Sequence, residues 1–97
     1  MSDTRIVELS GFEFTVRYAT SEEILKECGP DSYGCCSHPA DDNPEILVWD
    51  RLKGKKLIEI IIHEMMHGAF PQVAESVIKK NSREMANVIW EKGFRQK

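Results

Sequence analysis

Two histidines and a glutamate carry the strongest chemical signal in this chain. Residues His63–His67 read His-Glu-Met-Met-His, so the two imidazoles are four residues apart. On an α-helix that spacing puts both on one face, one turn apart, where they can bind a single zinc ion. Glu64 is rotated by about 100° from His63. It can therefore act as the general base on a zinc-activated water without binding the metal itself.

A catalytic zinc site usually has three protein ligands and one open position, so a third ligand is needed. No histidine follows His67, and Val73 occupies the position where another zinc-protease pattern has its third histidine. The acidic candidates downstream are Glu75, Glu84 and Glu91. We favour Glu75, because a short turn between antiparallel helices brings the start of the second helix back toward His67. The alternative is an acidic residue that only complements the positive end of that helix.

The motif must be carried by a central helix, which we predict over Lys53–Ala69. At 100° per residue an apolar face forms, made of Ile58, Ile61, Ile62, Met65 and Ala69. The two histidines of the motif fall on the opposite side. A second helix is predicted from Pro71 or Gln72 to Lys92, with a weak point at Asn81-Ser82 and a stop at Gly93.

The N-terminal half predicts a small sheet. The runs Arg5–Leu9 and Phe12–Tyr18 flank Ser10-Gly11 and form a hairpin, and the second run alternates apolar and polar residues. Thr20 and Glu23 fit the capping box of a short helix that ends at Gly29-Pro30. A strand follows at Glu45–Trp49. Its edge is a place where an extended peptide can dock by strand addition, although simple pairing inside the core is the favoured interpretation for most of its residues.

Residues 29–44 have turn chemistry throughout, and we expect a long loop there. Cys28, Cys35, Cys36 and His38 have the ligand types of a second zinc site, but their spacing is poor. An odd number of cysteines also argues against a closed disulfide framework. We therefore expect free, reduced thiols. His38 or Tyr33 could alternatively reach the zinc site and stabilise a developing oxyanion.

Composition excludes several classes of protein. Of the 97 residues, 41% are hydrophobic and 30% charged, which excludes a disordered, fibrous or repeat chain. The net charge of -3 offers no basic field for nucleic acid or an anionic membrane. No apolar signal segment opens the chain, and polar residues interrupt its longest apolar stretch. The sequence predicts one cytoplasmic domain over residues 1–97, small enough for a bound metal to matter to its stability.

Several shorter patterns accompany the motif. They are Tyr33-Gly34 with the cysteines after it, Ile46-Leu47-Val48, Asp50-Arg51-Leu52, the apolar residues Leu57, Ile61 and Ile62, Val88-Ile89-Trp90, and Gly93-Phe94-Arg95. Together with the N-terminal hairpin they cover nearly the whole chain, which resembles small zincin-like metallopeptidases encoded by phages and prophages. The resemblance implies a gluzincin-type site of His63, His67 and Glu75, a minimal zincin fold and peptidase activity. The chain departs from that pattern at residues 72–74, where relatives are more acidic.

We thus predict an α+β fold, in which the hairpin and strand 45–49 pack on the central helix and the C-terminal helix. The leading hypothesis is a zinc-dependent metallopeptidase with one Zn²⁺ per chain, a peptide or protein substrate, Glu64 as the general base, and no nucleic-acid or membrane partner. The alternative is a catalytically silent, zinc-stabilised binding or regulatory protein of phage origin. A third and weaker hypothesis is metal-assisted hydrolysis of a non-peptide bond.

Overall fold

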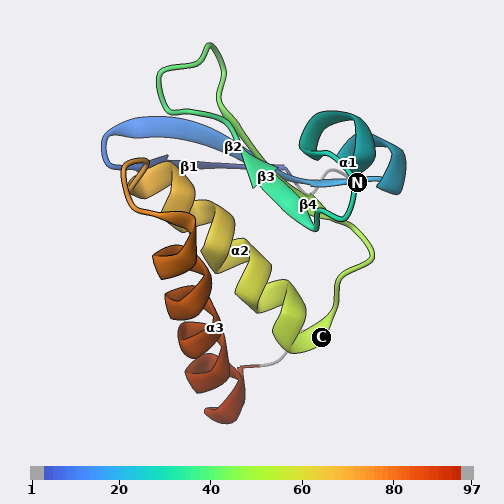
Figure 1. Ribbon diagram of the computed structural model, residues 1–97, viewed down its shortest axis with the longest axis vertical. Coiled ribbons are helices and arrows are strands. Elements are labelled where there is room, and N and C mark those ends of the chain that lie inside the picture. The colour runs from blue at the N-terminus through green and yellow to red at the C-terminus, as the bar shows by residue number, and fades with distance from the viewer. Residues whose placement is uncertain (1–3, 95–97) are drawn as a thin grey trace.

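The computed structural model describes residues 4–94. In this range four strands form one mixed sheet, two helices pack on the sheet, and a third helix packs on one of those two (Figure 1). The elements in chain order are β1 (Arg5–Leu9), β2 (Phe12–Ala19), α1 (Ser21–Cys28), β3 (Gly34–Cys36), β4 (Glu45–Trp49), α2 (Gly54–Ala69) and α3 (Glu75–Glu91). The predicted α+β class is confirmed by this arrangement.

The sheet has the strand order β1-β2-β4-β3. β1 and β2 form the predicted hairpin around Ser10 (φ 53°) and Gly11 (φ 86°), a pair of positive φ angles that suits the right-handed twist of a hairpin. β2 runs parallel to β4, and β3 runs antiparallel to β4. Strand 45–49 is thus paired inside the sheet, as expected for most of its residues, and the edge that could accept a peptide belongs to β3.

The prediction of an unstructured segment over residues 29–44 is also wrong at its centre. Gly34–Cys36 form β3, although turn residues surround this strand. The local residues do not favour a strand here, and the strand is stabilised by its pairing with β4. A Cβ on Gly34 would stand 2.5 Å from the Leu47 carbonyl oxygen, so a residue without a side chain is needed for this close approach.

The two faces of the sheet carry two separate apolar clusters. On one face, α2 covers a core of Phe14, Ile46, Val48, Leu52, Leu57 and Ile60. On the other face, α1 packs over Ala19, Ile24 and Leu47. α1 begins with the predicted capping box, in which Thr20 and Glu23 each accept a hydrogen bond from the other's backbone N–H. α3 packs mainly on α2 and lies outside it, rather than sharing the face of the sheet as predicted (Figure 1).

The buried face of α2 differs from the one that hydrophobicity predicts. Its buried positions include Leu57, Ile60, Glu64 and Gly68, which form the stripe that faces the sheet. Ile61 and Met65, from the predicted face, are only partly buried at the margin of the core. At Gly68 a Cβ would lie 3.1 Å from side-chain atoms of Leu9 and Phe14, so close packing has selected a small residue here.

α3 starts later than predicted and does not break. Residues 70–74 form the connection, and the first helical residue is Glu75. The predicted weak point at Asn81-Ser82 lies within a continuous helix, where Asn81 Nδ2 donates to the Val77 carbonyl (2.8 Å). Gly93, with φ 92°, follows the helix end as expected, whereas Arg95 lies outside the described residues. Within residues 4–94, no helix combines the length and the apolar character that a membrane crossing requires.

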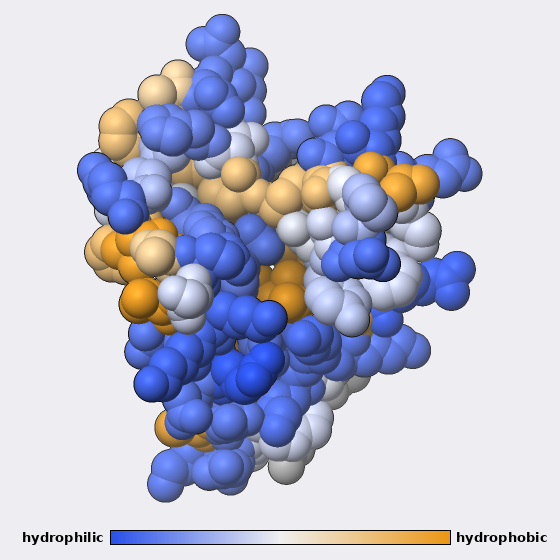
Figure 2. Space-filling model, viewed as in Figure 1, coloured by the Kyte–Doolittle hydropathy of each residue, from blue (hydrophilic) through white to orange (hydrophobic). Residues whose placement is uncertain are grey.

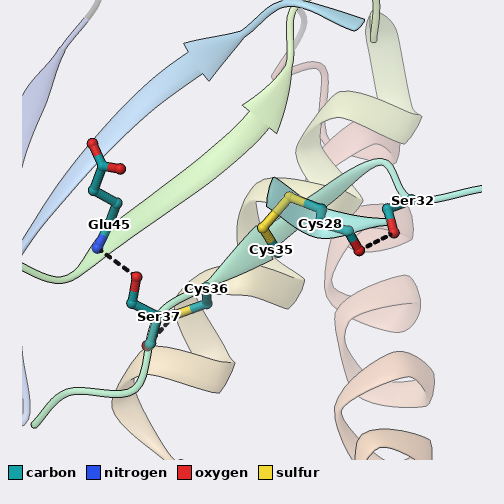
Figure 3. The surroundings of a disulfide bond; sticks show 6 residues. All are labelled: Cys28, Ser32, Cys35, Cys36, Ser37 and Glu45. Carbon is teal, nitrogen blue, oxygen red and sulfur yellow. Dashed lines mark hydrogen bonds between the residues drawn. A yellow bond between two sulfur atoms is a disulfide. The ribbon is translucent and has the colours of Figure 1, made fainter. Parts of the chain in front are cut away.

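The expectation of three free thiols is wrong. Cys28, the last residue of α1, and Cys35, on β3, form a disulfide across a Cα–Cα distance of 5.5 Å (Figure 3). The turn after α1 folds back, fastened by a hydrogen bond from Ser32 Oγ to the Cys28 carbonyl (2.9 Å), and this brings the two sulfurs together. Cys36 is left as a free thiol on the neighbouring position of β3.

Candidate metal centre

The connection between α2 and α3 brings Glu75 against the two histidines of the motif. The N–H of Phe70 donates to the Met66 carbonyl (2.8 Å), which closes α2, and the N–H of Val73 donates back to Phe70 (3.0 Å). Ala74 is extended, so α3 begins at the glutamate. Of the three acidic candidates, Glu75 is the one that the fold places beside His63 and His67.

Three potential ligand atoms converge at this point. His63 Nε2 lies 3.2 Å from His67 Nε2 and 3.1 Å from a Glu75 carboxylate oxygen, and His67 Nε2 lies 2.6 Å from the other oxygen. Two atoms bound to a tetrahedral zinc at about 2.0–2.1 Å lie roughly 3.3–3.4 Å apart. Two of the observed spacings, 3.1 and 3.2 Å, are close to that value, and the 2.6 Å contact is shorter, as in a hydrogen bond. The group of His63, His67 and Glu75 could therefore hold a metal ion.

The two histidines differ in how far they are buried. The His63 side chain is 12% exposed and the His67 side chain 28%, whereas Glu75 is 62% exposed. Burial lowers the pKa of His63, although the nearby Glu75 charge opposes this shift. A lowered pKa favours the neutral imidazole, and the neutral ring is the form that binds metal ions.

Glu64 lies on the stripe of α2 that faces the sheet and is only 6% exposed. Its side chain reaches toward β3, since the Glu64 Cγ lies 3.5 Å from the position of a Cβ on Gly34. Burial, and then the negative charge of Glu75, raise the pKa of Glu64 to about 7. The carboxyl therefore sits next to the ligand group with a pKa suited to proton transfer near neutral pH.

These side chains open into a cleft of about 440 Å³. One wall is β3 with the segment through Pro39, and the floor is formed by the motif on α2. Pro71 and Glu75 stand on the opposite side. Figure 2 shows this face of the molecule, where a mildly hydrophobic band runs over β3 and the surface is hollowed below it, next to hydrophilic surface over α2 and α3.

The outer edge of β3 faces this cleft. Trp49 N–H donates to the Tyr33 carbonyl and Ser37 N–H donates to the Glu45 carbonyl, each at 2.9 Å. In an antiparallel pair, residues that bond to the partner strand alternate with residues that do not. The backbone N–H and C=O groups of Gly34 and Cys36 consequently point away from β4, and both residues line the cleft.

The fold places His38 and Tyr33, the two candidates for stabilising an oxyanion, in different surroundings. His38 lines the cleft, and its Nδ1 accepts a hydrogen bond from the Ala40 N–H (3.0 Å). Tyr33 lies instead against the Trp49 ring, with centroids 6.1 Å apart, and under the Lys56 ammonium. Neither residue is among the three that could hold a metal.

The second zinc site considered at Cys28, Cys35, Cys36 and His38 is not formed. Two of its thiols are joined in the disulfide, and Cys36 Sγ donates to the Ser37 carbonyl (3.2 Å) (Figure 3). Burial, and then the nearby charge of Glu64, raise the pKa of Cys36 to about 12, so the thiolate that metals prefer is disfavoured. Within the described residues, the group that could hold a metal is His63, His67 and Glu75.

Two residues of this region escaped the sequence analysis. Gly34 lets β3 approach the sheet and α2 closely, and nothing in the sequence marks an isolated glycine as such a position. Ser82 is completely buried on α3, with its Oγ 3.5 Å from His63 Nδ1. A signal for Ser82 was present, since it is a serine on the otherwise apolar stripe that includes Ile78 and Ala86.

Comparisons with protein-family models, with curated proteins and with solved structures gave no match for this chain.

Proposed function

We propose that the protein is a zinc-dependent metallopeptidase with a zincin-like site of minimal size. The observation that carries this proposal is the convergence of His63, His67 and Glu75 at a cleft that also holds the buried Glu64. A site that served only to stabilise the fold would have no need of an acid–base group beside its ligands. The resemblance to phage-encoded zincin-like peptidases points in the same direction.

Zinc is the metal that best fits this donor set. Two imidazole nitrogens and one carboxylate oxygen are ligands typical of catalytic zinc, whereas calcium and magnesium prefer sites made only of oxygen. His63, His67 and Glu75 would hold the ion at the cleft. A zinc ion held there would lower the pKa of water to about 7 and polarise a carbonyl oxygen.

In this proposal Glu64 moves the proton. It accepts a proton from the attacking water and later delivers it to the amine of the leaving half of the peptide. Its burial against β3 holds the carboxyl at the cleft, beside the three ligand residues.

The substrate would lie along β3. An extended peptide can add to the sheet by bonding to the outward N–H and C=O groups of Gly34 and Cys36. A peptide held there runs across the cleft, past Glu64 and the three ligand residues. In this proposal the docking edge that was considered for strand 45–49 is that of β3.

Zinc content and peptide hydrolysis, measured on matched variants, test this function. The parent protein should bind about one zinc per chain and cleave members of a peptide library. Glu64→Gln should keep zinc and lose roughly 10²–10⁴-fold in rate, the usual contribution of a general base. Glu84→Gln, on the exposed side of α3, is the control and should retain both zinc and activity.

The result that contradicts peptidase function is a zinc-loaded parent that cleaves no peptide in the library. That outcome would favour the zinc-stabilised binding protein. Undiminished hydrolysis by Glu64→Gln would remove Glu64 from the mechanism. Zinc that remains bound in a His63→Ala, His67→Ala double variant would remove the site itself.

A further inference from the structure

A buried hydroxyl on α3 lies against the ring of His63. Ser82 is 0% exposed, and its Oγ lies 3.5 Å from His63 Nδ1, the ring nitrogen remote from the other two potential ligands. The same Oγ lies 3.2 Å from the Lys79 carbonyl oxygen one turn earlier on α3. The hydroxyl therefore bridges a helix backbone and an imidazole.

The position of each proton follows from these two contacts. A carbonyl oxygen can only accept, so the single hydroxyl proton of Ser82 is donated to Lys79. The lone pairs of Oγ are then left to face His63, where they can accept the proton of the tautomer that carries it on Nδ1. A neutral imidazole has one N–H, so His63 Nε2 keeps its lone pair. That nitrogen is the one directed at His67 and Glu75.

We propose that Ser82 is a positioning residue, which holds His63 in the tautomer and ring orientation that leave Nε2 free to bind zinc. This inference rests on the zinc site proposed above and adds to it a residue outside the ligands. Hydrogen bonds of this kind fix the tautomer of metal-binding histidines, and their removal typically weakens metal binding about 10–100-fold.

The surroundings of Ser82 argue against a role in packing alone. Ile78 and Ala86, one turn before and one turn after it on α3, are also completely buried and are apolar. An alanine would fill the position with better helix propensity and without a hydroxyl to satisfy. A serine at this position is explained by the contacts of its hydroxyl with the Lys79 carbonyl and with His63 Nδ1.

The test is zinc affinity, measured by competition with a chromophoric chelator. Ser82→Ala should fold, because alanine suits a buried helix, and should bind zinc about 10–100-fold more weakly than the parent. Ser82→Cys keeps a weak acceptor of similar size and should recover part of the affinity. Ile78→Val is the control for packing, since it loosens the same helix interface without removing a polar group, and should leave zinc affinity unchanged.

A spectroscopic readout separates orientation from stability. In the zinc-loaded parent, the His63 Nδ1–H proton should give a slowly exchanging NMR signal. In zinc-loaded Ser82→Ala that signal should exchange faster, while the corresponding His67 signal serves as the internal reference.

Each result decides a different claim. Equal zinc affinity of the parent and Ser82→Ala, with one zinc bound to each, would overturn the role of Ser82 and leave the zinc site intact. A fall in affinity of the same size in Ile78→Val would overturn it too, because packing would then explain the effect. A parent protein that binds no zinc would overturn both the inference and the proposed function.

Discussion

The two sides of the cleft are fastened by different chemistry. On one side, α2 and α3 meet at His63, His67 and Glu75, a group of polar side chains that can be joined through a metal. On the other side, β3 is tied to α1 by the Cys28–Cys35 disulfide and to β4 by strand pairing. Both fastenings act in addition to the small apolar core.

The difference lies in what each fastening can do besides holding the fold. The histidine and glutamate group is partly exposed and faces the cleft, so a metal bound there remains accessible to substrate. The disulfide packs beside the small apolar cluster under α1. Its bonded sulfurs do not titrate, so they offer no acid–base group to the cleft. We infer that the metal serves both stability and chemistry, whereas the disulfide holds the wall against which the substrate lies.

Removal of the metal should give the largest change in stability. With free zinc at a hundred times its dissociation constant, binding adds about 2.7 kcal/mol to the free energy of unfolding. For a domain of this size, each kcal/mol corresponds to about 4–8 °C in melting temperature. Chelation should therefore lower the melting temperature by roughly 10–20 °C, measured by calorimetry with and without chelator. A melting curve that does not move once zinc is shown to be removed would contradict the coupling.

Loss of the disulfide should destabilise the fold while leaving zinc in place. The bond closes a short loop, with a sequence separation of 7, for which chain entropy gives about 2–3 kcal/mol. Cys28→Ser, Cys35→Ser should lower the free energy of unfolding by that amount in urea denaturation, and its zinc affinity should stay near that of the parent. The control is Cys36→Ser, which leaves the bond intact. A large loss of zinc affinity in the double variant would mean that the two sides of the cleft are not independent.

A side chain at Gly34 should disturb the wall formed by β3. The new Cβ would stand 2.5 Å from the Leu47 carbonyl oxygen, which the strand pairing holds in place. Gly34→Ala should cost about 1–3 kcal/mol in the free energy of unfolding, as overpacking does elsewhere. Gly68→Ala, whose nearest neighbours at 3.1 Å are side-chain atoms, should cost less. An equal or greater cost at Gly68 would show that the approach of β3 is not the tighter contact.

The smallest effect concerns the free thiol beside the disulfide. The pKa of Cys36 is raised from 9.0 to about 12, so the thiolate is disfavoured in the folded protein at neutral pH. Near pH 8, iodoacetamide should label Cys36 about a hundred- to a thousandfold more slowly in the folded chain than in urea. Because the folded pKa is the higher one, this thiol stabilises the fold at neutral pH and loses that contribution as the pH rises from 9 toward 12. Mass spectrometry of the labelled protein checks the rate, and equal rates in the two states would contradict it.

Local patterns in the sequence were sufficient for much of the fold. The hairpin, the capping box at Thr20 and Glu23, strand Glu45–Trp49 and the helix that carries the motif all follow from short-range periodicity and turn residues. Glu75 could also be selected, because a short connection between two helices limits which glutamate can return to His67.

What the sequence analysis missed depends on contacts between separate elements of the fold. β3 exists because β4 pairs with it, and the Cys28–Cys35 bond forms because the turn between them folds back. The buried stripe of α2 includes Glu64 and Gly68, which hydrophobicity ranks below the isoleucines, since the shape of the sheet decides which side faces it. The role proposed for Ser82 depends on its contact with the ring of His63 on another helix, and the sequence does not show that contact.

Zinc K-edge X-ray absorption on the zinc-loaded protein is the most direct test of the proposed metal centre. We predict a first shell of nitrogen and oxygen atoms only, at about 2.0–2.2 Å, with the scattering pattern of two imidazoles. Glu75→Ala should alter that shell, and the matched Glu84→Ala should not. A sulfur ligand at about 2.3 Å, or an identical shell in Glu75→Ala, would contradict a centre built from His63, His67 and Glu75.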